Sequence, residues 1–225
     1  MICAVIPAFN ESENICWVVE KTKPFVDEII VVDDGSLDDT GYKALKCGAR
    51  VIRHPKNKGK GAALRTGFVK AIKLGADIVI TLDGDKQHNP DEIPRLLRRL
   101  ELSKADIIVG SRFLGGEDKL KKMPIQRILS NKLTTIILNG MFDLRITDSQ
   151  SGFRVFRASA LRKLAYVDNK FAAETEILID AHRKGFKIRD AEISVVYGEE
   201  KSKIRPFQDT FRWIFRVILK KLSSY

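Results

Sequence analysis

The chain has 225 residues, of which 44% are hydrophobic and 31% are charged, a balance that suits a globular domain with a sizeable core and excludes a wholly disordered chain. The 40 Lys and Arg residues exceed the 29 Asp and Glu residues, giving a formal net charge of +11. This excess indicates an anionic partner such as a nucleic acid, a phosphorylated metabolite or a membrane surface, although Lys-rich surfaces are also common in thermophiles.

The first residues, MICAVIPAFN, have no basic region before an apolar stretch, so they predict a first strand and not a signal peptide. No stretch offers the roughly 18 uncharged apolar residues that a membrane span requires. The three cysteines, Cys3, Cys16 and Cys47, form no metal-like cluster, and their odd number favours a reducing compartment. We interpret all three as small buried hydrophobic residues.

Short apolar, β-branched segments alternate with longer amphipathic ones over the first half of the chain. The predicted strands are residues 2–6, 28–32, 49–53, 77–82 and 106–110. The predicted helices are residues 12–23, 39–47, 61–74 and 91–102, the last with a cap at or near Asp91, behind Pro90. This alternation predicts an α/β fold with a mostly parallel sheet and helices on both faces.

After residue 115 the pattern changes. A charged segment, GGEDKLKKMP, predicts a mobile loop, and residues 124–142 place apolar side chains at helical spacing. Residues 151–157 and 191–198 predict further strands around a helix at 174–184. With no internal repeat or low-complexity linker, we expect one domain over residues 1–206.

The last segment, residues 207–225, predicts a basic amphipathic helix. Arg212, Arg216 and Lys220 fall four residues apart, opposite a face of Phe, Ile and Leu side chains. Such a helix suits a membrane interface or docks on the core as a terminal helix, and we keep both alternatives. In the first case, removing these residues preserves donor binding and lowers activity on a membrane-embedded acceptor.

Two pairs of aspartates follow predicted strands. Asp83 and Asp85 flank Gly84 after IVITL, and Asp33 and Asp34 follow IIVV. Ligands of parallel α/β sheets bind beyond the carboxyl ends of the strands, and paired carboxylates there need a cation or hydrogen-bond donors. Oxygen ligands on a tight turn suit Mg²⁺ or Mn²⁺, with Gln87 and His88 close enough to add a ligand. The alternative for Asp-Gly-Asp is a polar turn.

A Gly- and Lys-rich segment, NKGKGAALRTG at residues 57–67, precedes a predicted helix. It could hold a phosphate at the helix N-terminus, but it does not match the full P-loop pattern, so we assign it a supporting role. His54 and His182 are isolated and receive no role.

Five separated motifs resemble one family. VIPAFNE, VVDDGSLDDT, NKGKGAALRTGF, TLDGDKQHNP and VGSRF occur in the order found in family-2 glycosyltransferases with the GT-A fold. The resemblance spans about residues 2–200, and the most similar members are polyprenyl-phosphate sugar synthases of the dolichyl-phosphate mannose synthase type.

The resemblance implies a site for a nucleoside-diphosphate sugar. Base and ribose contacts would come from Pro7, Phe9, Glu11, Val32 and Asp34; ribose and diphosphate contacts from Asp83, Gly84 and Asp85; and a closing basic contact from Lys201. The divalent cation, Mg²⁺ or Mn²⁺, would be held by Asp83, Asp85 and Gln87.

On the acceptor side, the resemblance implies that Arg112 faces the donor diphosphate or the acceptor phosphate. The DSQSGFRVFR segment would bring Asp148, Ser149 and Arg154 near the reaction centre, and Arg127 and Ser130 would contact the acceptor. The chain departs from the family in having Val195 where an arginine is expected before VYG.

The implied reaction is inverting, metal-dependent transfer of a sugar, from a GDP-mannose or UDP-glucose type of donor, to a polyprenyl or dolichyl phosphate. A phosphate acceptor is already ionised, so basic residues that position it, such as Arg112, matter more than a catalytic carboxylate. A sugar hydroxyl would need a general base, for which Asp148 is the candidate. Asp85 would act through the metal that neutralises the leaving diphosphate. The alternative for Asp148 is a turn or capping aspartate. We expect a cytoplasmic enzyme, peripheral at the cytoplasmic face of a membrane and without a nucleic-acid partner.

Three other functions compete with this prediction. One is a glycosyltransferase acting on a soluble or polysaccharide acceptor, and another is a non-catalytic protein that binds an anionic membrane or nucleic acid. The third, a sugar-nucleotide pyrophosphorylase, lacks its expected Gly-Arg-Pro start loop here.

Overall fold

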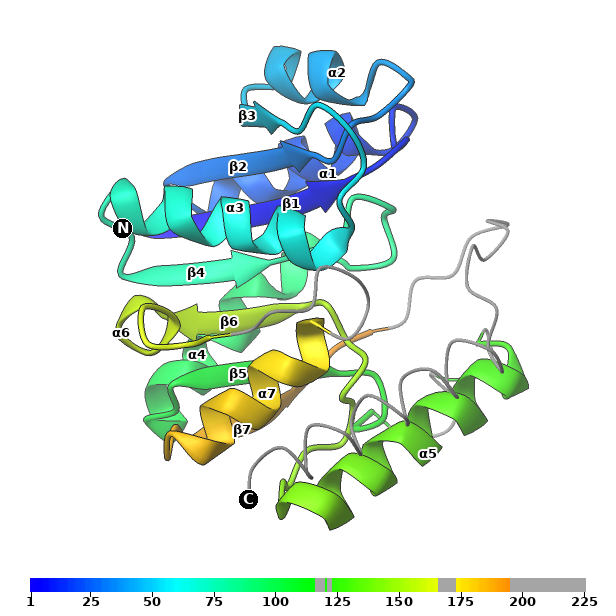
Figure 1. Ribbon diagram of the computed structural model, residues 1–225, viewed down its shortest axis with the longest axis vertical. Coiled ribbons are helices and arrows are strands. Elements are labelled where there is room, and N and C mark those ends of the chain that lie inside the picture. The colour runs from blue at the N-terminus through cyan, green and yellow to red at the C-terminus, as the bar shows by residue number, and fades with distance from the viewer. Residues whose placement is uncertain (116–119, 121–122, 166–172, 195–225) are drawn as a thin grey trace.

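The computed structural model of the chain describes residues 1–115, 120, 123–165 and 173–194 (Figure 1). These residues form one sheet with the strand order β3-β2-β1-β4-β6-β5-β7. The strands are β1 Ile2–Ala8, β2 Glu28–Asp33, β3 Arg50–Arg53, β4 Ile78–Thr81, β5 Ile107–Ser111, β6 Arg154–Arg157 and β7 Ile188–Glu192. Strand β6 runs antiparallel to β4 and β5, and the other neighbours pair in parallel. The prediction of a mostly parallel α/β sheet is confirmed.

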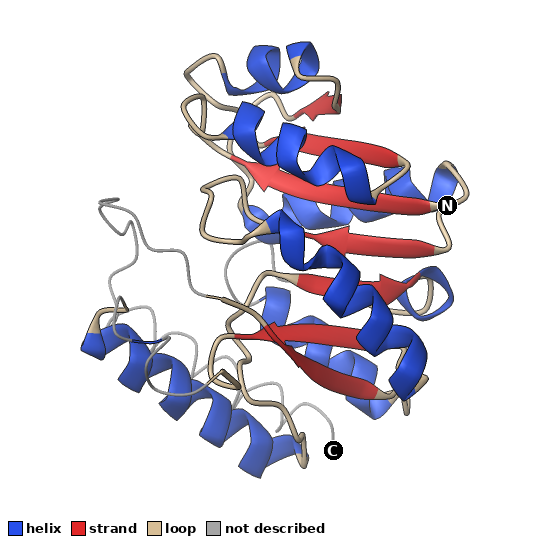
Figure 2. Cartoon of the chain, turned by 180° about the vertical axis from the view of Figure 1, so that it is seen from behind, coloured by secondary structure: helices blue, strands red, loops and turns tan. Residues whose placement is uncertain are grey.

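Helices cover both faces of the sheet (Figure 2). Helices α3 and α7 pack on one face, where a core cluster also takes in part of α5, while α1 and α4 pack on the other. The α-helices are α1 Ile15–Thr22, α2 Thr40–Lys46, α3 Lys60–Lys73, α4 Ile93–Ser103, α5 Ile125–Phe142, α6 Ala158–Leu161 and α7 Ala173–Arg183. Two short 3-10 helices, η1 Lys23–Phe25 and η2 Pro90–Glu92, precede β2 and α4.

Strand β1 shows why the predicted strands are continuous apolar runs without alternation. Its Val5 side chain joins the cluster under α3, and Ile6 joins the cluster under α1. Both side chains are fully buried, as expected for a parallel strand covered on two faces. Helix α3 approaches so closely that a Cβ on Gly67 would lie 2.3 Å from Val5 Cγ1.

The last predicted strand is misplaced. The apolar run at 191–198 suggested a strand there, but β7 begins at Ile188 and ends at Glu192. Within the described part of the chain β7 is the last strand of the sheet, with β5 as its neighbour, and it buries Ile188 and Ala191 while Arg189 is exposed. Edge strands carry charged residues, which hid β7 from a search for apolar runs.

The interpretation of the cysteines is wrong for two of the three. Cys16 and Cys47 are partly exposed and joined in a disulfide, whereas Cys3 is fully buried and free, as predicted. The odd number of cysteines therefore reflects one pair plus one buried thiol, and it does not indicate a reducing compartment.

The carboxyl ends of β1, β2, β4 and β5 meet along one edge of the sheet, on the right in Figure 1. The antiparallel β6 begins at that edge, so the segment before it lies among the ends of the other strands. Among the described residues, no helix is long and apolar enough to cross a membrane. Val195, Lys201 and residues 207–225, which carried predictions, lie outside the described residues.

Candidate active site

The centre of the site is the acidic turn after β4. Asp83 and Asp85 flank the buried Gly84, and the backbone N–H of Gln87 donates to Asp85 Oδ1 over 3.0 Å. The next residue, Lys86, has a φ of +62°, a left-handed conformation that is uncommon for a non-glycine residue. Strained backbone of this kind clusters at ligand-binding loops.

His88 is buried and holds this turn in place through its ring. Its Nδ1 accepts a hydrogen bond from the backbone N–H of Asp83 over 3.1 Å, and its ring lies 5.3 Å from that of Phe153. Burial lowers the pKa of His88 to about 4, so the ring is neutral at neutral pH. Through Nδ1, His88 positions the acidic turn, and its role as an additional metal ligand stays a prediction.

Lys60, at the start of α3, links the acidic turn to α7. Its ammonium lies 2.5 Å from Asp83 Oδ1 and 2.8 Å from Glu174 Oε1. A Cβ on Gly152 would lie 2.9 Å from atoms of all three side chains, so only glycine leaves room where these charges converge. The hydroxyl of Thr81 holds this glycine by donating to its carbonyl over 2.7 Å.

The two aspartates of the turn differ in their electrostatics. Burial would raise the pKa of Asp83, but the positive charge of Lys60 brings it down to about 2. Burial, reinforced by the negative charge of Asp83, raises the pKa of Asp85 to about 7. The turn is therefore short of positive charge at Asp85, and a divalent cation would supply it.

The predicted donor residues at the end of β1 lie beside the acidic turn. A Cβ on Gly84 would be 3.5 Å from Glu11 Cγ and 3.5 Å from Ala8 Cβ, which are ordinary contacts. Pro7 is buried in β1, while Phe9 and Glu11 are half-buried. The protein itself would thus tolerate a side chain at Gly84, in keeping with a glycine that leaves space for a ligand.

Asp34, which is predicted to lie beside the base and ribose, forms hydrogen bonds within the protein. Its carboxylate accepts backbone N–H groups of Lys58 and Gly59 at 2.7–3.1 Å, and His54 Nδ1 lies 2.6 Å away. The other nitrogen of His54 lies 2.9 Å from the Thr66 hydroxyl. Asp34 therefore holds the loop that leads to Lys60, and His54, which received no role, is part of that support.

Val32 reaches the same edge only through its backbone. Its side chain is fully buried in the core cluster beneath α3. The structure thus groups Pro7, Phe9, Glu11, Asp83, Gly84 and Asp85 along the edge, with Val32 and Asp34 behind them.

Arg112, just after β5, forms a two-pronged ion pair with Asp148. Arg112 Nε and an Nη nitrogen donate to the two Asp148 oxygens over 2.7 and 2.9 Å, and the Arg112 backbone N–H donates over 3.2 Å. Asp148 is fully buried and Arg112 is 14% exposed at its side chain. Such a fork-shaped pair fixes the plane and the position of the guanidinium.

The other acceptor-side residues divide into two groups. Ser149 and Arg154 are buried: Ser149 pairs with Thr135 on α5 over 3.0 Å, and Arg154 donates to the carbonyls of Ser149, Ser151 and Glu174. They shape the loop around Asp148. Arg127 and Ser130 lie in the first two turns of α5 and are half-buried.

Sequence reasoning missed Lys60, Glu174 and Gly152. Lys60 belonged to the Gly- and Lys-rich segment, but its pairing with Asp83 depends on where α3 begins against β4. Glu174 carried no signal, because nothing near it in the sequence indicates that α7 starts at this edge. Gly152 was visible only as part of the DSQSGFRVFR motif.

Comparison with known proteins accounts for this arrangement. Residues 3–165 match the family model described as glycosyl transferase family 2. The chain is 35% identical over 223 residues to the UDP-N-acetylglucosamine–dolichyl-phosphate N-acetylglucosaminyltransferase of Methanococcus voltae, covering 88% of this chain and 87% of the relative. It is 30% identical over 234 residues to the dolichol-phosphate mannosyltransferase of Pyrococcus furiosus, covering 96% of this chain and 63% of the relative.

A solved structure with the same fold is glucosyl-3-phosphoglycerate synthase from Mycobacterium tuberculosis, in complex with Mn²⁺, UDP-glucose and phosphoglyceric acid. The TM-score is 0.73 at 24% identity, over 98% of this chain and 79% of that one. The family match covers well over half of the residues and includes the acidic turn after β4 and the antiparallel β6. The chain therefore belongs to glycosyl transferase family 2, and it is an enzyme that transfers a sugar from a nucleotide-sugar donor.

Proposed function

We propose that this enzyme transfers a sugar, with inversion, from a nucleoside-diphosphate sugar to a polyprenyl or dolichyl phosphate. The observation that carries the acceptor is an exposed apolar stripe on α5, next to the loop that holds Asp148. The relatives from Methanococcus voltae and Pyrococcus furiosus, whose names specify dolichyl or dolichol phosphate, support the same acceptor class.

The donor half of the proposal rests on the acidic turn. Asp83 and Asp85, with Gln87 two residues on, offer the oxygen ligands that Mg²⁺ or Mn²⁺ prefers. A divalent cation bound there would neutralise charge on the leaving diphosphate. Lys60, held between Asp83 and Glu174, adds a fixed positive charge beside the same oxygens. Phe9 and Glu11 would bound the base and ribose.

On the acceptor side, the Arg112 pair with Asp148 favours a phosphate. Both carboxylate oxygens of Asp148 are engaged by Arg112, so this carboxylate is poorly placed to take a proton from a sugar hydroxyl. A lipid phosphate is ionised at neutral pH and needs positioning and charge complementarity, which an oriented guanidinium provides. We assign Arg112 to binding a phosphate and Asp148 to orienting Arg112.

The stripe on α5 consists of Ile125, Leu129, Leu133 and Ile136, which are 69%, 62%, 50% and 67% exposed. These residues repeat at intervals of four, four and three, so they share one side of the helix. The helix is tied to the site through Thr135, which pairs with Ser149, and through Lys132, whose Nζ lies 5.8 Å from the centre of the Phe113 ring. An apolar helix side beside a phosphate-binding arginine suits a lipid acceptor at a membrane surface.

The acceptor class is tested by a transfer assay with radiolabelled UDP- and GDP-sugars and Mn²⁺. Short polyprenyl phosphates, the corresponding polyprenols and soluble oligosaccharides would be offered in parallel. We expect label to enter only the polyprenyl phosphate, and the product to be cleaved by mild acid, as a glycosyl phosphate is.

Two variants divide the roles within this assay. Asp85→Ala should abolish both transfer and metal-dependent stabilisation by the nucleotide in a thermal-shift assay. Asp148→Asn should retain donor binding and lose transfer through a raised KM for the phosphate acceptor, because Arg112 loses its orientation. Transfer to an oligosaccharide hydroxyl, abolished in Asp148→Asn at unchanged KM, would contradict the proposal.

A further inference from the structure

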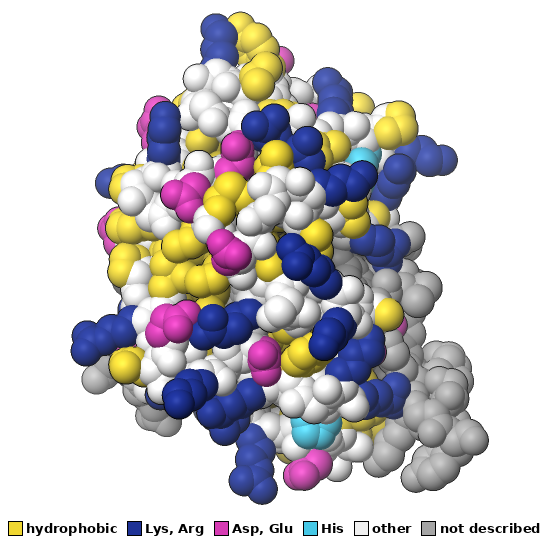
Figure 3. Space-filling view, turned by 90° about the vertical axis from the view of Figure 1, so that its left-hand side faces the viewer, with side chains coloured by type: hydrophobic (Ala, Val, Ile, Leu, Met, Phe, Trp, Pro, Cys, Tyr) yellow, Lys and Arg dark blue, Asp and Glu magenta, His cyan; other side chains and the backbone are white. Residues whose placement is uncertain are grey.

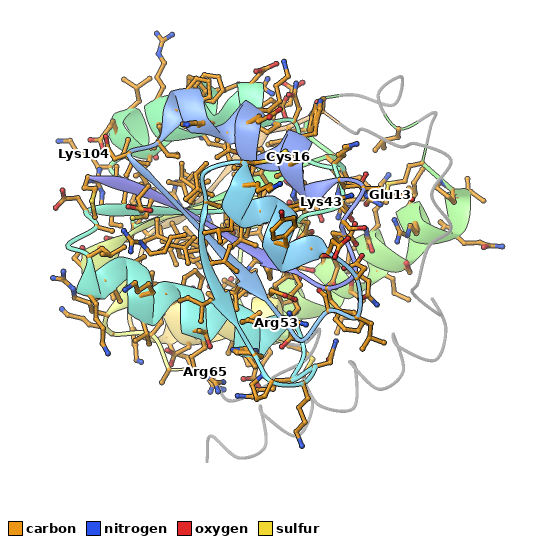
Figure 4. All side chains as sticks on the ribbon, turned by 90° about the horizontal axis from the view of Figure 1, so that it is seen from above. Glu13, Cys16, Lys43, Arg53, Arg65 and Lys104 are labelled. Atoms are coloured by element: carbon orange, nitrogen blue, oxygen red, sulfur yellow. A yellow bond between two sulfur atoms is a disulfide. The ribbon has the colours of Figure 1, made fainter. Side chains whose placement is uncertain are left out.

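The Cys16–Cys47 disulfide joins the two helices that flank the proposed nucleotide-binding loops. Cys16 lies in the first turn of α1, and Cys47 directly follows α2. Their Cα atoms are 5.6 Å apart across a sequence separation of 31 residues. Seen from above in Figure 4, Cys16 lies on α1 where that helix passes beside α2. Both cysteines are partly exposed, so a soluble thiol can reach them, whereas Cys3 is fully buried.

The same two helices are also connected through the loops that precede them. The backbone N–H of Asn10 donates to the Ser36 hydroxyl over 3.0 Å, and that of Glu11 donates to the Thr40 hydroxyl over 2.8 Å. Asn10 has a φ of +56°, so the loop after β1 is held in a conformation that the chain would not favour alone. The loop after β1 carries Phe9 and Glu11, which the proposed function places against the donor base and ribose.

The disulfide and the hydrogen bonds between the loops therefore hold the donor edge from two sides. At one end the loops are held by hydrogen bonds that water can replace, and at the other end α1 and α2 are held covalently. Breaking the disulfide removes the covalent constraint on the relative position of α1 and α2. The hydrogen bonds between the loops must then hold this position alone. A pocket that is correctly formed for a smaller fraction of the time binds its ligand proportionally more weakly.

We propose that Cys16 and Cys47 form a reversible thiol–disulfide site that sets the affinity for the donor nucleotide. A dithiol reductant attacks the disulfide, the Cys16–Cys47 bond breaks through a mixed disulfide, and the reductant leaves as its own disulfide while both cysteines gain a proton. A disulfide of the same class reverses the step. Glu20 Oε1 lies 3.6 Å from Cys16 Sγ, within reach of a hydrogen bond from the thiol that reduction creates. The proposal rests on the proposed function where it concerns nucleotide affinity.

The first part of the test counts thiols on the full chain. Protein purified without reductant is treated with N-ethylmaleimide before and after incubation with dithiothreitol, and intact masses are measured. We expect no label before reduction and two labels after it, with a third only on unfolding, because Cys3 is buried. Two labels before reduction would show that the pair is not joined and would overturn the proposal.

The second part measures affinity for UDP and GDP with Mn²⁺ by calorimetry on oxidised and reduced protein. We expect reduction to weaken binding by roughly threefold to tenfold. The double variant Cys16→Ser, Cys47→Ser should match the reduced protein and ignore dithiothreitol. Cys3→Ser is the matched control and should respond to reduction as the native chain does. Equal affinity in both redox states would overturn the proposal.

Two further arms separate the remaining explanations. The sulfur atoms of Cys16 and Cys47 and a carboxylate oxygen of Glu20 lie within 4.8 Å of one another, a grouping that could hold a metal ion. If Zn²⁺ binds the reduced protein one to one and blocks reoxidation, the site is a metal site and the redox proposal fails. If neither nucleotide binds in either state, the proposed function fails. Hydrogen exchange then tests the redox proposal by itself: faster exchange at residues 9–14 and 36–40 on reduction supports it, and unchanged exchange overturns it.

Discussion

At the scale of single residues, the acidic turn is built for a ligand and not for the stability of the protein. Asp85 is mostly buried next to Asp83, and the pKa of Asp85 is raised to about 7 by that burial and by its neighbour's charge. Sites that hold like charges together in this way destabilise the empty protein unless one group takes up a proton or a bound ligand supplies the opposite charge.

This leads to a prediction for the metal-free protein. Because the folded-state pKa of Asp85 lies above the unfolded value, its stabilising contribution is present at low pH and is lost as pH rises from about 4 through 7. In EDTA, Asp85→Asn should raise the free energy of unfolding by about 1–2 kcal/mol at pH 8 and by almost nothing at pH 4. Urea unfolding across this pH range measures the difference.

The exposed Asp91 supplies the control, since Asp91→Asn also removes one carboxylate from the same region. Its stability profile should follow that of the native chain. If Asp85→Asn and the native chain lose stability in parallel as pH rises, the electrostatic account of the turn is wrong.

Gly152 is the residue at which geometry and charge are most tightly coupled. In Gly152→Ala, the new Cβ would meet the ends of the Asp83, Lys60 and Glu174 side chains at 2.9 Å. These ends can move, so we expect the fold to survive while the Asp83 carboxylate, which we propose as a metal ligand, is displaced. The transfer rate should fall by roughly tenfold to a hundredfold, measured beside thermal unfolding.

Gly140→Ala is the matched control, because a Cβ there meets nothing within 4 Å. It should leave transfer unchanged and stabilise α5 slightly. A Gly152→Ala variant that unfolds early, or one with full activity, would each contradict this view of Gly152.

At the scale of elements, a strand or contact could be predicted when neighbouring residues in the sequence indicate it. Strands β1, β2 and β4 are buried and mostly apolar, and β2 and β4 lead into aspartates, so these strands and the turn at Asp83 could be predicted. Strand β7 is charged because it is an edge, and it was misplaced. The Lys60–Glu174 contact joins the starts of α3 and α7, which are far apart in the sequence, so no local pattern predicts it.

Helix α5 allows a test of the membrane contact. Leu129→Ser with Leu133→Ser removes the centre of the exposed stripe, and each leucine that leaves an apolar environment costs up to about 1.5–3 kcal/mol. We expect transfer to a polyprenyl phosphate in vesicles to fall by roughly tenfold or more. Transfer to a short acceptor in detergent should be unchanged.

Leu45→Ser on α2 is the control for this test, because Leu45 is 61% exposed but lies on the far side of the sheet order from α5. An equal loss in both assays would point to a disturbed site instead of a lost membrane contact. Vesicle flotation of the same variants distinguishes binding from turnover.

At the scale of the whole molecule, net charge proved a weak guide. Lys and Arg side chains are spread over the face at the left of Figure 1, away from the proposed site, among acidic and apolar ones (Figure 3). Charge alone therefore suggested an anionic partner without locating it. The joint order of the five motifs located the site, because four fall at the carboxyl ends of β1, β2, β4 and β5, which the sheet brings to one edge, and the fifth begins α3.

The insertion of the antiparallel β6 between β4 and β5 has a consequence for the order in which the enzyme is assembled. Strands β1 to β4 pair among themselves and are complete by residue 81, whereas the partners of β5 in the described sheet are β6 and β7. As the chain leaves the ribosome, the half that we assign to the donor can form while β5 has no strand to join. The half assigned to the acceptor waits for residues 154–192, so the two substrates meet across a seam between early and late parts of the chain.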